Sequence, residues 1–227
     1  PAYGRCKGNV IFYHGWSSRK EQNSFLAKIL SQFCYRVVVP DAVYHGERGT
    51  VDYGDPQVFA EYSWRAVLRN IEESSSLLRA ACNKLRVSET DFAVAGESMG
   101  GFSAAGAFVQ NGGLRCLVNI NGSCAFSKIL TLQLSVFGDL LPEQQESVRK
   151  YDPADHPEKL NTRPILLLHG TADTTIPIEA QRYFVSEMSP RYQSCPDRLR
   201  LIESPNLNHY FTLFMAEETV NWLDRFF

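Results

Sequence analysis

The sequence predicts an α/β fold in which a mostly parallel sheet of about six strands is flanked by helices. Apolar, β-branched runs alternate along the chain with segments of helical periodicity, as expected when each strand is followed by a crossover helix. Residues 35–39 (YRVVV) and 164–168 (PILLL) are continuously apolar over most of their length. Such runs are typical of parallel strands that are buried on both faces of a sheet.

The expected elements follow in chain order. Strands are predicted at residues 9–13, 35–39, 91–95, 114–120, 164–168 and 198–202. Helices are predicted at residues 21–33, 57–85, 98–110, 178–188 and 211–226. In the first helix, apolar side chains recur at helical spacing from Phe25 to Phe33, and Pro40 ends the strand that follows it.

A chain of 227 residues with 44% hydrophobic content suits a single domain, 1–227. Segment 121–163 breaks the alternation, because an apolar stretch is followed there by a polar stretch with three prolines. It is too long for a simple connection. We therefore expect an insertion that forms a small helical cap over the strand ends. An ordinary crossover helix with an extended connection is the alternative.

Charge and cysteine content limit the expected partners. The net charge is −2 and 21% of residues are charged, which is no reason to expect a nucleic acid or a membrane surface as a partner. The sequence has neither a signal-peptide pattern nor an apolar stretch of about 20 residues, so a cytoplasmic location is expected. The six cysteines form no CxxC pair and no zinc-ligand pattern. Free thiols are expected, with a disulfide-containing secreted protein as the alternative, and no metal is expected.

Residues 96–100 read G-E-S-M-G and match the G-x-S-x-G nucleophile elbow between a strand and a helix. The glycines keep a sharp, strained turn uncrowded. The hydroxyl of Ser98 would lie at a helix N-terminus, whose partial positive charge favours developing negative charge. Ser98 is therefore the predicted nucleophile. A serine that only caps the helix is the alternative.

A serine nucleophile needs a base, and the base needs a carboxylate that orients it. His209 lies in a polar loop between the last strand and the last helix, and Asp173 closely follows the fifth strand. This gives the chain order serine, aspartate, histidine that is known from such sites. A surface histidine and a helix-capping aspartate are the alternatives.

The remaining parts of the site are expected near the same strand ends. The backbone N–H groups of Trp16 and Met99 are the predicted oxyanion donors, because Gly15 allows close approach and Met99 follows the nucleophile. The side chains of Trp16, Phe126, Phe137 and Ile176 are expected to bind the substrate. His14 is expected to pack or to form hydrogen bonds within its turn.

Together these motifs resemble the α/β-hydrolase superfamily. The chain is similar, more narrowly, to small bacterial esterases of the YjfP/YitV type, which are related to dienelactone hydrolases and to the catalytic domains of prolyl oligopeptidases. The resemblance runs from about residue 9 to the C-terminus and rests on residues 12–21, 39–48, 96–101, 169–173 and 208–209.

The resemblance implies an α/β-hydrolase fold, ester hydrolysis without a cofactor, and a catalytic triad of Ser98, Asp173 and His209. It also implies that His45 braces its loop. The sequence departs from the pattern at Trp16, where smaller aromatic residues are also common. Few residues precede the first strand, so the edge strands that usually open this fold are expected to be absent or truncated.

The predicted function is that of a serine carboxylesterase that cleaves a small-molecule ester with a small or medium acyl group through an acyl-enzyme. A serine peptidase or aminoacyl hydrolase, or an acyltransferase or thioesterase, would use the same triad. A non-catalytic binding protein on this scaffold is the third alternative. The sequence predicts no oligomeric state.

Overall fold

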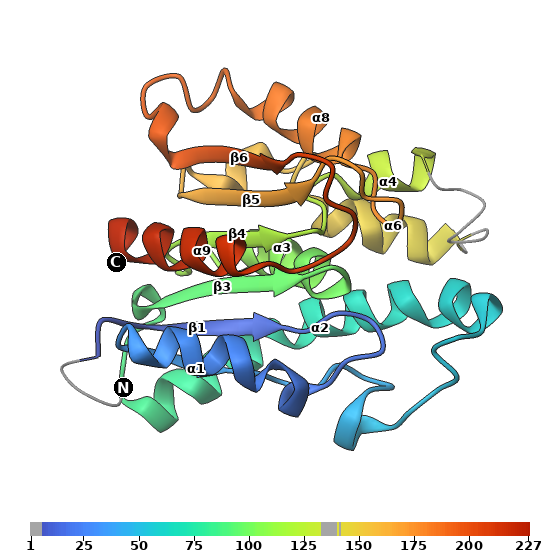
Figure 1. Cartoon of the computed structure of the whole chain (residues 1–227), viewed down its shortest axis with the longest axis horizontal. Helices are drawn as coiled ribbons and strands as arrows, with labels where there is room; N and C mark the ends of the chain where they lie inside the picture. Colours follow the sequence, from blue (N-terminus) through green and yellow to red (C-terminus); the bar gives the residue numbers. More distant parts are fainter. Residues whose placement is uncertain (1–5, 133–139, 141) are drawn as a thin grey trace.

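The computed structural model describes residues 6–132, 140 and 142–227. Its sheet has six strands: β1 (Gly8–Tyr13), β2 (Tyr35–Val38), β3 (Phe92–Glu97), β4 (Leu117–Ile120), β5 (Ile165–Gly170) and β6 (Leu199–Ser204). The order across the sheet is β2-β1-β3-β4-β5-β6, and every neighbouring pair is parallel. In Figure 1 the strand arrows accordingly point the same way. The predicted α/β fold with a parallel sheet is confirmed.

The strand order reverses direction at β1. The chain passes from β1 to the edge strand β2 and then returns to β3 on the other side of β1. In open parallel sheets the crevice for a ligand lies beyond the carboxyl ends of the strands at such a point. The turn after β1 and the turn after β3 are therefore adjacent.

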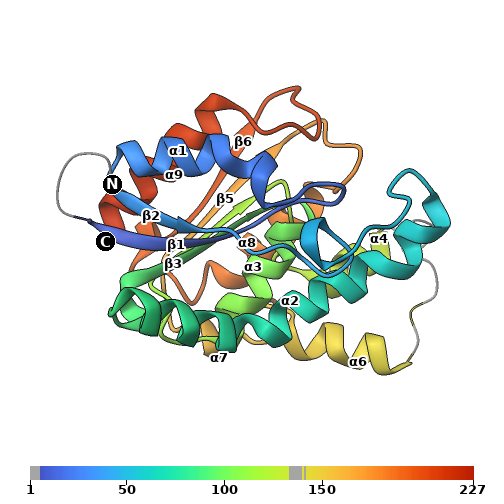
Figure 2. The same ribbon diagram turned by 90° about the horizontal axis from the view of Figure 1, so that it is seen from below.

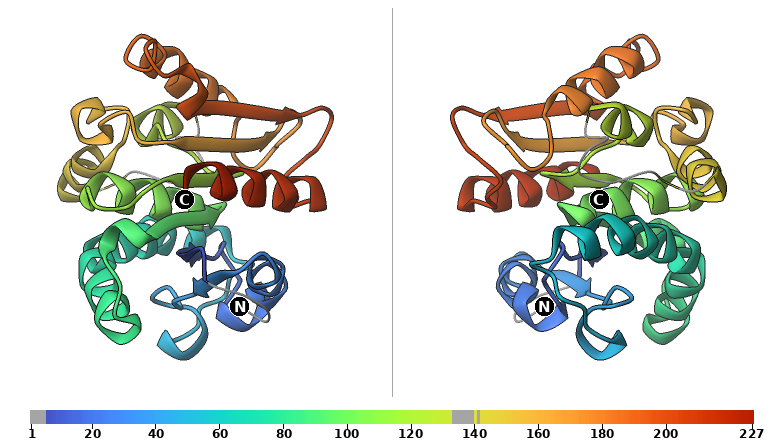
Figure 3. Two further views of the ribbon diagram at one scale, coloured as in Figure 1. Left: turned by 90° about the vertical axis from the view of Figure 1, so that its left-hand side faces the viewer. Right: turned by 90° about the vertical axis from the view of Figure 1, so that its right-hand side faces the viewer.

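Helices cover both faces of the sheet, as Figures 2 and 3 show. One face carries α1 (Ser24–Gln32) and α9 (Leu213–Phe226), and the other carries α2 (Pro56–Leu85), α3 (Met99–Gln110) and α8 (Glu179–Met188). Each face has its own cluster of buried apolar side chains. Short 3-10 helices lie at Lys20–Asn23, Gly46–Arg48, Glu89–Asp91 and Pro196–Arg198.

The long helix α2 matters most for the position of the site. It begins after Asp55, whose side chain accepts a hydrogen bond from the backbone N–H of Gln57, with Pro56 in the first turn. It packs closely on α3, where a Cβ added to Gly106 would collide with the side chain of Ile71. This close packing brings the first half of α2 beside the N-terminus of α3.

Some predicted boundaries differ from the structure by a few residues. The fourth strand begins at Leu117 and not at residue 114, because Leu114 donates a backbone hydrogen bond to Asn111 in a turn. The last helix begins at Leu213, because the side chain of Thr212 caps it by accepting from Met215 N–H.

Segment 121–163 contains α4 (Phe126–Leu132), α6 (Pro142–Tyr151) and α7 (Pro157–Leu160). Helix α6 contacts α2, α3 and α4, and α7 contacts α3, so these helices extend the layer on the α2–α3 face. The cap insertion stays a prediction. Among the helices of the described residues, none is both long and apolar enough to cross a membrane.

Candidate active site

The turn between β3 and α3 holds Ser98 in a strained backbone conformation, with φ 54° and ψ −122°. Positive φ is uncommon for a residue with a side chain and persists only where the surroundings enforce it. Here the Ser98 N–H donates to the carbonyl of Ile120 at 2.9 Å, and the Ser98 carbonyl accepts from the Gly101 N–H at 2.8 Å. Backbone contacts on both sides therefore fix the direction of the hydroxyl.

Two glycines make this turn possible for steric reasons. A Cβ at Gly96 would collide with the carbonyl oxygen of Gly100, and a Cβ at Gly100 would collide with that of Tyr13. Both obstacles are backbone atoms, which cannot rotate away. The G-x-S-x-G pattern is thus required by the close approach of β1, β3 and α3.

His209 lies between Ser98 and Asp173. Its Nε2 atom is 2.9 Å from Ser98 Oγ and its Nδ1 atom is 2.8 Å from Asp173 Oδ2. The carboxylate only accepts, so Nδ1–H donates to Asp173 and Nε2 accepts from the Ser98 hydroxyl. The structure thus brings the three predicted residues together from three separate loops, in an arrangement that can transfer a proton from the hydroxyl to the imidazole.

The carboxylate of Asp173 is fully buried and has several hydrogen-bond donors around it. Its Oδ1 atom accepts from the backbone N–H groups of Thr175 at 2.8 Å and Ile176 at 2.9 Å. Burial alone would raise the pKa of Asp173, but hydrogen bonds from His169, His209 and the Ile176 N–H hold it well below its usual range. Asp173 is therefore ionised at neutral pH.

His169 is a further contact of Asp173 that the sequence analysis did not assign. Its side chain is fully buried, and its Nε2 atom lies 2.9 Å from the Ile176 carbonyl and 3.2 Å from Asp173 Oδ2. Both oxygens are acceptors, so Nε2 carries the proton. The available signal was its position in the last residues of β5, four residues before Asp173.

Asn208 joins the Asp173 loop to the His209 loop. Its Oδ1 atom accepts from the backbone N–H of Thr174 at 2.9 Å and from that of His209 at 2.8 Å. The Asn208 side chain thus links the loop after β5 to the loop after β6 and fixes their relative position. We call the loops after β3, β5 and β6, which carry Ser98, Asp173 and His209, the strand-end loops.

Of the two residues predicted to supply oxyanion donors, Met99 directly follows Ser98, and Trp16 follows Gly15, which contacts the Ser98 turn. Met99 is the first residue of α3, so its N–H has no partner within the helix. Gly15 packs against the Ser98 turn, where an added Cβ would lie 3.5 Å from Ser98 Cβ. The Trp16 indole Nε1–H donates to the carbonyl of Tyr53 at 3.2 Å, which anchors the loop after β1.

His14 and His45 contact the loop after β1, which carries Trp16. The Nδ1–H of His14 donates to the Gly15 carbonyl at 2.8 Å, and its Nε2 accepts from the Ala42 N–H at 3.0 Å. Burial lowers the pKa of His14, although the Gly15 carbonyl and the nearby Asp41 carboxylate partly oppose this shift, and the ring is therefore neutral at neutral pH. The His45 ring packs edge-on against Trp16 with centroids 5.0 Å apart. Both histidines have the bracing contacts that were expected.

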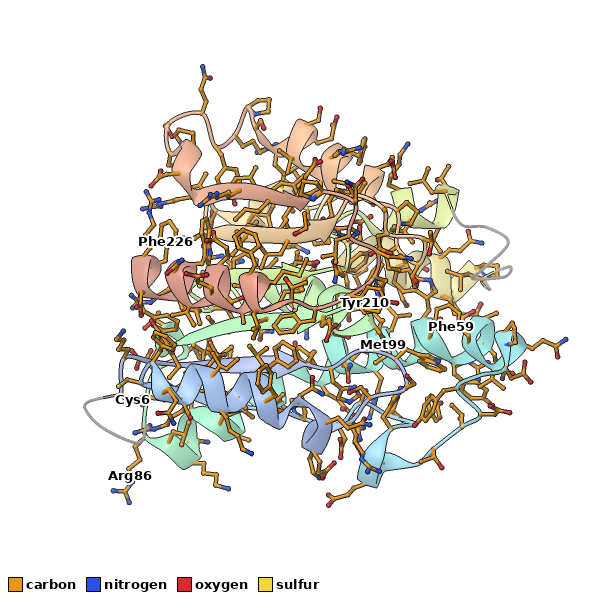
Figure 4. All side chains as sticks on the ribbon, in the orientation of Figure 1. Cys6, Phe59, Arg86, Met99, Tyr210 and Phe226 are labelled. Atoms are coloured by element: carbon orange, nitrogen blue, oxygen red, sulfur yellow. The ribbon has the colours of Figure 1, made fainter. Side chains whose placement is uncertain are left out.

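A cavity of about 230 Å³ opens next to Ser98 and His209. Its lining residues are Trp16, Phe59, Ser63, Trp64, Val67, Ser98, Met99, Phe102, Thr175, Ile176 and His209. In Figure 4 the labelled residues Phe59 and Met99 lie beyond the carboxyl ends of the strands. The cavity walls are largely apolar.

Two of the four predicted substrate-binding side chains, Trp16 and Ile176, line this cavity. Phe126 does not: it is fully buried behind the wall, with ring centroids 5.6 Å from Trp64 and 5.6 Å from Phe102. It packs inward because α4 lies against neighbouring helices. Phe137 lies outside the described residues.

Sequence reasoning missed the side of the cavity that α2 forms. We call this side, made of Phe59, Ser63, Trp64 and Val67, the α2 wall. In the sequence these residues belong to a helix whose apolar positions face a core. Their spacing indicates a buried face but does not reveal that part of this face meets a cavity.

Comparison with known proteins agrees with this fold and shows the family of the chain. The model of the prolyl oligopeptidase family matches residues 47–226. The chain is 29% identical to the putative esterase YitV of Bacillus subtilis, over 96% of this chain and 88% of that protein. It is 32% identical to the esterase YjfP of Escherichia coli, over 75% of this chain and 70% of that protein. The crystal structure of TT1662 from Thermus thermophilus matches 98% of this chain and 90% of its own, with a TM-score of 0.81 and 23% identity.

Proposed function

Because this chain belongs to the prolyl oligopeptidase family, within the α/β-hydrolase superfamily, we propose that it is a serine carboxylesterase. The observation that carries the proposal is the hydrogen-bonded series of Ser98, His209 and Asp173 at an apolar cavity. Two relatives named as esterases, YitV and YjfP, support the choice of an ester as substrate.

The first half of the reaction forms an acyl-enzyme. His209 Nε2 accepts the proton of Ser98 as Oγ attacks the ester carbonyl carbon, and the carbonyl oxygen becomes an oxyanion. The N–H groups of Met99 and Trp16 stabilise this oxyanion. The bond to the alcohol oxygen then breaks, and His209 donates the proton to the leaving alcohol.

The second half releases the acid. Water attacks the acyl-enzyme carbonyl while His209 accepts its proton, and the tetrahedral intermediate then expels Ser98 Oγ, which takes the proton back. Asp173 stays ionised throughout, since its pKa is held low, and so it stabilises the imidazolium that forms in each half.

The composition of the cavity favours an uncharged ester over a peptide. Among the described residues that line it there is no lysine, arginine, aspartate or glutamate. A peptidase or aminoacyl hydrolase that holds a free amine needs an acidic group for it. Faster turnover of a p-nitroanilide than of the matched p-nitrophenyl ester would favour the peptidase, and net transfer to an added alcohol or thiol would favour an acyltransferase.

The decisive experiment replaces the nucleophile. Ser98→Ala is expected to lower kcat for p-nitrophenyl acetate by about 10⁴-fold or more, since other triad members cannot substitute for the nucleophile. It should also abolish labelling by a fluorophosphonate probe. Ser76→Ala, which removes an exposed serine of α2, is the matched control and should keep both properties. Hydrolysis by Ser98→Ala at the parent rate would overturn the proposal.

A further inference from the structure

The polar side chains of the described cavity lining are for the most part not available to a substrate. The Trp16 indole N–H already donates to the Tyr53 carbonyl at 3.2 Å. The Ser63 hydroxyl and the Trp64 indole N–H are buried with almost no accessible surface, so a ligand atom in the cavity does not reach them. Apart from the nucleophile and its base, this leaves Thr175, which is exposed to solvent. A substrate group that enters the cavity therefore meets a hydrocarbon surface.

This hydrocarbon surface is largely aromatic. The aromatic residues of the lining come from three elements: Trp16 from the loop after β1, Phe59 and Trp64 from α2, and Phe102 from α3. Trp64 and Phe102 are almost fully buried. Trp16 and Phe59 are only half-buried. These two residues therefore provide more of the aromatic surface that a substrate can reach.

The indole ring of Trp16 is held in place by other rings. Its centroid lies 5.4 Å from that of Tyr53 and 5.4 Å from that of Phe59, at interplanar angles of 89° and 88°. The His45 ring packs against it at 5.0 Å and 77°. Edge-to-face contacts of this kind are the favoured geometry of aromatic pairs. Together with the hydrogen bond of the indole N–H, they fix the ring before a substrate binds, so little further ordering is needed on binding.

We infer that an aromatic ring of the substrate enters this cavity, so that the natural ester carries an aryl group on a short linker in its acyl or its alcohol part. The cavity of about 230 Å³ has room for such a group, since an apolar cavity of roughly 150 Å³ holds benzene. A ring loses less conformational freedom on burial than a flexible chain of the same carbon number. It also gains aromatic contacts with Phe59 and Trp16. This inference rests on the proposed esterase function and deepens it.

Two sets of esters without a p-nitrophenyl ring test the inference. In the acyl set, methyl phenylacetate is compared with methyl cyclohexylacetate and methyl octanoate. In the alcohol set, benzyl acetate is compared with cyclohexylmethyl acetate and heptyl acetate. Within each set the varied groups have the same number of carbon atoms. Each kcat/KM from a pH-stat is divided by the rate constant for hydroxide hydrolysis of the same ester, which removes differences in intrinsic reactivity. The set that responds identifies the part of the ester that enters the cavity.

In at least one set, the corrected kcat/KM of the aryl ester is expected to exceed that of its cyclohexyl analogue about fivefold, as for one favourable aromatic pair. Phe59→Leu removes the ring but keeps an apolar side chain, and it should lower this ratio about threefold. Phe59→Tyr keeps the ring and should keep the ratio. Phe25→Leu, which removes an exposed ring from α1 on the opposite face, is the control and should leave every ratio unchanged. Melting temperatures report whether each variant is folded.

The inference is overturned if the aryl ester is not the fastest member of either set after correction, or if Phe59→Leu leaves the ratio of aryl to cyclohexyl ester unchanged. These outcomes differ from a failure of the esterase proposal. In that case the parent hydrolyses none of these esters, or Ser98→Ala hydrolyses them equally well.

Discussion

The strand-end loops and the α2 wall form two sides of one cavity, but they are held in place by different means. Ser98 and Asp173 are fixed by backbone hydrogen bonds, and Ser98 also by the strained turn that it occupies. In the α2 wall, residues such as Phe59 and Val67 are placed by the spacing of a regular helix and by packing on α3.

This difference suggests a division of roles. Groups that act on the reacting carbonyl lower the barrier for every substrate, whereas groups that contact the rest of the substrate change the ratio between substrates. Changes in the strand-end loops should therefore lower all rates by a common factor. Changes in the α2 wall should alter selectivity and leave the shortest esters almost unaffected.

The largest effect after loss of the nucleophile is expected for Asp173→Asn. An asparagine can present its amide N–H to His209 Nδ1, which favours the wrong imidazole tautomer, and such a change lowers kcat by about 10⁴-fold in serine hydrolases. We expect the same factor for p-nitrophenyl acetate and butyrate, measured under saturating substrate.

Asp197→Asn is the matched control, because Asp197 forms an exposed ion pair with Arg225 and lies just before β6, at the end of that strand opposite to His209. It should retain parent activity. A fall in activity of Asp173→Asn that differs strongly between acetate and butyrate would contradict the proposed division of roles.

The strand-end loops were predictable from sequence for a physical reason. Strands that are buried on both faces have continuously apolar sequences, so their ends can be located in the sequence. A parallel sheet places the carboxyl ends of its strands at one edge. The glycines at Gly96 and Gly100 are required by backbone contacts. Ser98, Asp173 and His209 could therefore be selected by their position after strands, before any contact was known.

The α2 wall could not be predicted in the same way. An apolar stripe on a helix has the same pattern whether it faces a sheet, another helix or a cavity. Phe126 shows the converse error: it was expected at the substrate and instead packs behind Trp64. Which aromatic side chain reaches the cavity depends on the packing of α2, α3 and α4, which local sequence does not encode.

His169 allows a finer test within the strand-end loops. His169→Ala removes a donor to Asp173 and to the Ile176 carbonyl, and we expect kcat to fall about tenfold with little change in KM. His169→Gln can place an N–H near the same oxygens and should recover part of this loss. Such recovery, together with a loss of stability in His169→Ala that is larger at neutral pH than in acid, would contradict a role in packing alone.

The pH dependence of stability gives an independent readout for His169. The pKa of Asp173 is lower in the folded than in the unfolded chain, so its ionised form stabilises the fold above the unfolded pKa. This contribution is lost as the pH falls. Without the His169 donor the pKa of Asp173 is less depressed, so His169→Ala should lose stability relative to the parent at neutral pH and differ less from it in acid. Denaturant unfolding at pH 7 and at pH 3 measures the change.

The smallest effect on the basal reaction is expected for Phe59→Ala in the α2 wall. An acetyl group is too short to bury much apolar surface against this wall, whereas each further buried methylene contributes about 0.8 kcal/mol to the binding free energy. We therefore expect kcat/KM for p-nitrophenyl acetate to stay within about twofold and that for the butyrate to fall about fivefold. Phe25→Ala, which removes an exposed phenylalanine from α1 on the opposite face, should change neither. Equal losses for acetate and butyrate would mean that Phe59 acts through the Trp16 loop, with which its ring is in contact, and not through the substrate.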